Sequence, residues 1–76
     1  MIDVTWMSDA ETVKLLDQGE VVSSAWITKG RTQRQNARKI FTDNLGAVEF
    51  VKFDESPSWG MNVVMRRATE PEMKRE

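Results

Sequence analysis

The sequence contains no cysteine, no histidine and no tyrosine, and these absences narrow the chemistry open to the protein. Without cysteine there is no disulfide, no thiol nucleophile and no thiolate metal site. Without histidine the chain lacks the side chain that most often binds zinc or acts as a general base. We therefore expect no cofactor and no metal site, and we expect a protein that is not an enzyme.

Long apolar runs are also missing. No stretch approaches the roughly 20 apolar residues that cross a bilayer, and the N-terminus lacks the basic and apolar regions of a signal peptide. The chain has 76 residues, of which 39% are hydrophobic and 30% charged, as is typical of one small globular domain. We expect a cytoplasmic protein without a membrane partner.

The hydrophobic pattern predicts four strands and two helices in the order β-α-β-α-β-β. The predicted strands are residues 2–7, 20–28, 47–53 and 60–67, which alternate apolar and polar residues or are rich in β-forming residues. The polar segment 54–58, which contains proline, indicates that the last two strands form a hairpin. This order predicts an α+β fold with a small mixed sheet and both helices packed on one face.

Each predicted helix follows a capping signal. Ser8 and Glu11 have the spacing of a capping box, in which each residue's side chain accepts from the other's backbone N–H. Thr32 and Gln35 have the same spacing, so we expect the second helix over about residues 33–45. The apolar residues expected to face the core from these helices and strands are Ile2, Val4, Trp6, Val13, Leu16, Ala37, Ile40, Phe41, Leu45, Met61, Val63 and Met65.

The supply of large apolar side chains is generous for a chain of this length, with three tryptophans, three phenylalanines and five methionines. We expect Trp6, Trp26 and Trp59 to pack in the core or at an interface, because each can bury a large apolar area. A homodimer is therefore an alternative to a monomer. Residues 69–76 are mostly charged, so we expect a single domain over residues 1–68 and a flexible tail after it.

The net charge of −1 hides an uneven distribution of charge. Residues 21–42 contain no acidic residue but hold five basic ones. At about 100° per residue, the basic residues of the second predicted helix share one exposed stripe with Gln35. Positive charges at neighbouring positions of a helix repel one another, and positive charges near its N-terminal end are also unfavourable because that end of the helix dipole is positive. We therefore expect an anion to bind this stripe.

We therefore predict a regulatory protein that binds nucleic acid through this stripe. RNA is favoured over duplex DNA, because an arginine-rich helix suits irregular RNA and no helix-turn-helix pattern is present. The predicted contacts are Lys29, Arg31, Arg34, Gln35, Arg38 and Lys39, with an extension to Lys52, Trp59, Arg66 and Arg67 if the hairpin lies near the helix. In that extension, Trp59 would stack on a base.

Besides a structural subunit of a larger assembly, which would have no ligand, two alternatives stay open at this point. In the first, carboxylates of the same chain, such as Glu20, Asp43 or Glu49, pair with the basic stripe, which is then an ordinary solvated surface. In the second, the protein is a small inhibitor or adaptor that docks on an acidic protein through the basic helix or an exposed strand edge. Its size is typical of accessory proteins encoded by phages or mobile elements.

Overall fold

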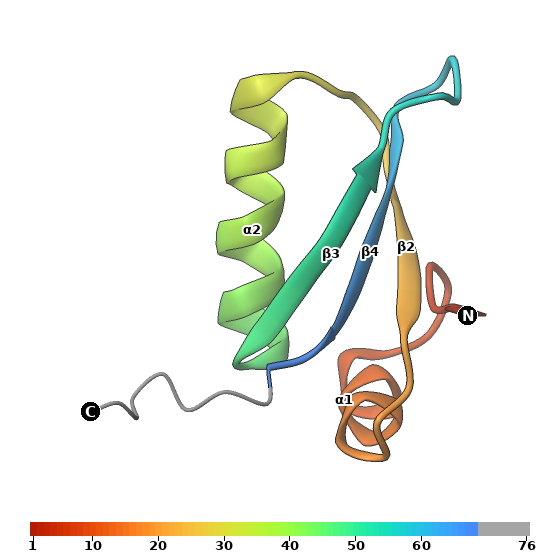
Figure 1. Cartoon of the computed structure of the whole chain (residues 1–76), viewed down its shortest axis with the longest axis vertical. Helices are drawn as coiled ribbons and strands as arrows, with labels where there is room; N and C mark the ends of the chain where they lie inside the picture. Colours follow the sequence, from red (N-terminus) through yellow and green to blue (C-terminus); the bar gives the residue numbers. More distant parts are fainter. Residues whose placement is uncertain (69–76) are drawn as a thin grey trace.

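A computed structural model describes residues 1–68 and shows a four-stranded mixed sheet with two helices (Figure 1). The elements along the chain are β1 (Ile2–Asp3), α1 (Asp9–Asp17), β2 (Val22–Trp26), α2 (Arg31–Leu45), β3 (Val48–Asp54) and β4 (Met61–Arg67). The predicted fold class and the predicted order of elements are confirmed. The predicted tail, residues 69–76, lies outside the described residues.

The strands lie in the order β1-β2-β4-β3. β1 runs parallel to β2, and β4 runs antiparallel to both of its neighbours, so the hairpin predicted from the sequence is present. β3 forms one edge of the sheet and contacts α2. The register between β3 and β4 shifts between Phe50 and Lys52, which marks a β-bulge in this edge strand.

One apolar face of the sheet forms the core with both helices. Val22 of β2 lies opposite Met65 of β4, and both side chains are fully buried. Leu16 of α1 and Ala37 of α2 belong to the same buried cluster, so the two helices cover the same face of the sheet. Met61 is also fully buried, as predicted for both methionines of this strand.

The two helices begin in different ways. The Ser8 side chain accepts from the N–H of Glu11 at 3.2 Å, and the Glu11 carboxylate accepts from the N–H of Ser8 at 3.5 Å, which confirms the predicted capping box. α2 instead begins at Arg31 after Gly30, which has a φ of 111° and provides no side-chain cap. The capping box predicted at Thr32 is therefore wrong, because the helix already includes that residue.

The chain turns immediately after β1, which ends at Asp3 instead of continuing to residue 7. The carboxylate of Asp3 accepts from the N–H of Thr5 at 2.9 Å and from its hydroxyl at 2.6 Å. The hydroxyl oxygen of Thr5 accepts in turn from the N–H of Ala25 at 3.0 Å. This turn directs Trp6 into solvent, with 93% of the residue exposed, so its predicted place in the core is wrong.

The other tryptophans differ from each other. Trp26 packs edge-on against Phe41 at 5.6 Å between ring centres, and its indole N–H donates to Gln33 at 3.1 Å. Trp59, in the loop before β4, is 46% exposed. Ile40 was expected in the core but is 44% exposed, because it lies at the rim of the helix face that packs on the sheet. Packing of the exposed tryptophans at a subunit interface stays a prediction.

Candidate nucleic-acid interface

The predicted basic stripe lies on α2, on the side of the helix that borders β3. Arg31, Arg38 and Lys39 are exposed, whereas Ala37, on the adjoining face of the helix, is fully buried. The guanidinium of Arg38 lies over the ring of Phe53 in β3, 5.2 Å from the ring centre. In Figure 1, α2 runs alongside this edge strand. The stripe and β3 therefore form one continuous surface.

The start of α2 holds a carboxylate that comes from the loop between β3 and β4. Glu55 accepts from the guanidinium of Arg34 at 2.7 Å and from the N–H of Gly30 at 3.1 Å. The bond from Arg34, followed by the bond from Gly30, lowers the pKa of Glu55 below its ordinary value of 4.5. The anion expected at this positive helix end is thus supplied by the chain itself.

Lys29 fastens the same loop from its other side. Its ammonium donates to the carbonyl of Glu55 at 2.7 Å and to the carbonyl of Pro57 at 2.5 Å. We call this set of contacts among Lys29, Gly30, Arg34, Glu55 and Pro57 the loop clasp. Two of the predicted contact residues, Lys29 and Arg34, therefore hold the loop against the start of α2.

Three cations of the stripe remain available to a ligand. Within residues 1–68, Arg31 and Arg38 form no ion pair. Lys39 lies 3.5 Å from Asp43, one of the carboxylates considered above, but the two side chains are 77% and 61% exposed. Ion pairs this exposed contribute little and are readily exchanged. Residues 1–68 thus compensate the stripe only in part.

Two residues of the predicted extension lie elsewhere. Lys52 is opposite Val64, and Arg66 is opposite Glu49, with 3.0 Å between the guanidinium of Arg66 and the carboxylate. Val64 and Arg66 alternate along β4 with Met61, Val63 and Met65, which belong to the core on the helix side, so Lys52 and Arg66 face away from the helices. The structure therefore places Lys52 and Arg66 on the other face of the sheet from the stripe.

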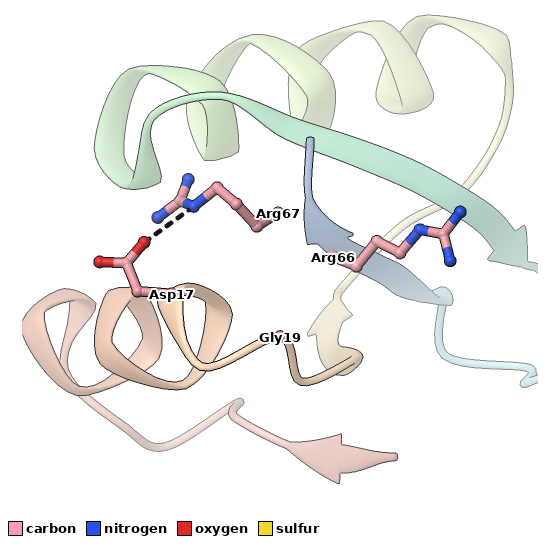
Figure 2. Close-up of a pocket in the computed structure, with 4 residues that line it drawn as sticks. All are labelled: Asp17, Gly19, Arg66 and Arg67. Atoms are coloured by element: carbon pink, nitrogen blue, oxygen red, sulfur yellow. Dashed lines mark hydrogen bonds and ion pairs between the residues drawn. The ribbon is translucent and has the colours of Figure 1, made fainter. Parts of the chain in front are cut away.

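Arg67 binds the far end of α2. It donates to the carbonyls of Leu45 at 2.9 Å and Ala47 at 2.8 Å, and to the carboxylate of Asp17 at 3.0 Å. Figure 2 shows that Arg66 points away while Arg67 reaches toward Asp17, in a surface pocket of about 370 Å³. A cation at this helix end satisfies unpaired carbonyls and favours the helix dipole. Arg67 therefore has a structural role.

Of the four residues in the predicted extension of the contact surface, Trp59 lies at the same end of the molecule as the start of α2. It follows the loop residues that the loop clasp holds, and it is partly exposed. Gln35, also predicted as a contact, is exposed on α2. The structure thus brings Arg31, Gln35, Arg38 and Lys39 together on one helix, with Trp59 near its beginning.

The sequence analysis missed two features of this surface. Glu55 was read only as part of a turn, although α2 has no acidic residue in its first turn and so needs a carboxylate from elsewhere. Phe50 and Phe53 stack at 5.7 Å between ring centres, with 12° between the ring planes. At a spacing of three they would face opposite sides of a regular strand, and the bulge brings them to one side.

Within residues 1–68, no group of three or more potential metal-binding side chains is close enough to hold a metal ion. In the same part of the chain, neither helix combines the length and the apolar character needed to span a bilayer. No family model, curated protein or solved structure matches this chain. Its function is therefore inferred from the surface formed by α2 and β3.

Proposed function

We propose that this chain is a non-catalytic, cytoplasmic regulatory protein that binds nucleic acid, RNA in particular, through the exposed face of α2. The observation that carries the proposal is a row of three cations, Arg31, Arg38 and Lys39, which within residues 1–68 form either no ion pair or only a highly exposed one. Guanidinium groups bind phosphate with two parallel hydrogen bonds, and Gln35 beside them can bond to sugars, bases or phosphate oxygens.

RNA fits this surface better than duplex DNA does. α1 and α2 are separated by β2, so they do not form the helix-turn-helix unit that inserts a helix into the major groove. α2 also buries Ala37 and Leu45 against the rest of the fold, which leaves one side of the helix for a ligand. A one-sided cationic surface beside an edge strand suits an irregular or single-stranded RNA.

The test is a pair of double variants with equal changes of charge. Arg31→Glu with Arg38→Glu removes two phosphate contacts, whereas Lys14→Glu with Lys52→Glu makes the same change at exposed positions away from the stripe. We expect the first pair to weaken binding to a pool of random 20-nucleotide RNA by at least 100-fold, and the second by only a few-fold. Glutamate at position 31 suits the start of a helix, so the fold should persist.

Two results would overturn the proposal. One is that the wild-type protein binds no RNA or DNA pool in a mobility-shift assay at low salt. The other is that both double variants weaken binding equally, because that would assign the effect to net charge instead of the stripe. Circular dichroism of each variant confirms that the comparison is made between folded proteins.

A protein-binding inhibitor or adaptor is the second candidate, favoured by the edge strand. β3 has seven residues and pairs on one side only, with β4, in the described sheet. Its unpaired backbone groups can accept a strand from a partner protein or from a second copy of this chain. Co-purification with and without RNase separates the candidates, because partners retained after digestion favour protein binding.

A further inference from the structure

We propose that the ligand of this surface is a single-stranded segment of nucleic acid that stacks one unpaired base on Trp59. This inference rests on the proposed function and names the class of ligand for the same site. Trp59 is 46% exposed in the loop that the loop clasp fastens to the start of α2, so an aromatic side chain and Arg31, the first residue of α2, lie at the same end of the molecule.

The backbone that carries Trp59 is held in place. The loop clasp fixes the preceding residues, with Lys29 bonded to the carbonyl of Pro57. Gly60 follows, and its backbone approaches the end of β2 so closely that an added Cβ would lie 2.2 Å from the carbonyl oxygen of Trp26 and 2.5 Å from the N–H nitrogen of Thr28. An aromatic side chain on a fixed backbone loses less conformational freedom when a base stacks on it.

The neighbours of Trp59 suit a nucleotide. The backbone of Ile27 also adjoins Gly60, and Ile27 is 71% exposed, so a second apolar residue is accessible close to this loop in the described structure. Arg31, the first residue of α2, forms no ion pair within residues 1–68, and the nearby carboxylate of Glu55 is already bonded to Arg34. A strand with one base stacked on Trp59 would bind a phosphate at Arg31, which forms no ion pair within residues 1–68.

A second stacking position lies further along the surface. The guanidinium of Arg38 lies over the ring of Phe53, 5.2 Å from its centre, in a cation–π contact, and guanidinium planes can stack on unpaired bases. Bases inside a duplex are already stacked and paired, so they present no face to either position. The combination of cations with aromatic platforms is the pattern that binds single strands.

The experiment measures dissociation constants by fluorescence anisotropy with two labelled probes, a 12-nucleotide oligouridine and a 12-base-pair RNA duplex. We expect the single strand to bind more tightly. Trp59→Ala should weaken its binding by between about five-fold and about 150-fold, the range for loss of one base–aromatic stack. Trp59→Phe should restore most of the affinity. The matched control is Trp6→Ala, because Trp6 is more exposed but lies outside this surface.

A direct readout follows the tryptophan itself. Oligouridine should quench the fluorescence of the wild-type protein, and the quenching should be lost in Trp59→Phe and kept in Trp6→Phe. The inference is overturned if the duplex binds as tightly as the single strand, or if neither Trp59 variant changes affinity or quenching. If either result is obtained but Arg31→Glu with Arg38→Glu still abolishes binding, the proposed function stands and only the stacking on Trp59 is excluded. Failure of this inference can therefore be distinguished from failure of the proposed function.

Discussion

The carboxylate of Glu55 lies 2.7 Å from the guanidinium of Arg34, and this pair joins the loop between β3 and β4 to the first turns of α2. The two residues are 21 positions apart in the sequence. The contact neutralises one arginine of the stripe and supplies the negative charge that the start of α2 lacks. Because Arg34 is paired in this way, the cations of the stripe that are left for the proposed ligand are Arg31, Arg38 and Lys39.

Removing the charge of Glu55 should destabilise the protein slightly. In Glu55→Gln the side chain keeps its shape but loses the charge that Arg34 and the helix end favour. We expect the thermal midpoint to fall by a few degrees at most, because ion pairs this exposed contribute little. Asp54→Asn is the charge-matched control, since asparagine can keep the local bonds to Ser56. Equal losses in the two variants would contradict this role for Glu55.

Stability should depend on pH in the acid range. The folded-state pKa of Glu55 is below its ordinary 4.5 because of Arg34, and those of Asp3 and Asp54 are below 3.8 because of hydrogen bonds from Thr5 and Ser56. A lowered pKa contributes stability that is complete above the ordinary value and is lost as pH falls through the folded-state value. Urea midpoints should therefore fall from about pH 4.5 downward.

The same experiment on Glu55→Gln provides the check. The variant cannot gain a proton at position 55, so its stability should decline less than that of the wild type as the solution becomes acidic. The two curves should approach each other as the pH falls through the folded-state pKa of Glu55, which lies below its ordinary value. Parallel curves over the whole range would show that Glu55 does not contribute.

The two adjacent arginines of β4 should behave differently. Arg67→Met removes a cation that bonds two carbonyls and Asp17, so we expect a loss of about 1.5–3 kcal/mol in the free energy of unfolding. Arg66→Met removes one exposed ion pair with Glu49, so we expect a loss below about 1 kcal/mol. Urea denaturation measures both. A larger loss for Arg66 would contradict the structural assignment of Arg67.

Salt should weaken RNA binding in proportion to the number of phosphate contacts. Contacts from Arg31, Arg38 and Lys39 to a single strand predict a slope of about −2 for log K against log salt concentration. Replacing Lys39 by glutamine should make the slope shallower by about 0.7. Replacing Lys52 by glutamine should leave it unchanged, because Lys52 lies on the other face of the sheet. Binding that is insensitive to salt would exclude the phosphate contacts.

Short-range signals account for the parts of the fold that could be predicted. The capping box of Ser8 and Glu11 spans four residues, and the face shared by Met61 and Met65 follows from strand alternation. By contrast, Trp6 also matched the strand pattern, but hydrogen bonds from Thr5 to the carboxylate of Asp3 form a turn that ends β1 before Trp6. The hydrophobic periodicity of a few residues does not predict whether a hydrogen-bonded turn or a continued strand forms at such a position.

The sequence alone determined the order of the elements, the apolar faces that form the core and the clustering of positive charge between residues 21 and 42. Each of these depends on neighbours within a few positions. Only the tertiary structure decided that Glu55 neutralises Arg34, that Arg67 binds the end of α2, and that Phe53 lies beneath Arg38. Those contacts join residues far apart in the chain, and their formation depends on how the sheet and helices pack.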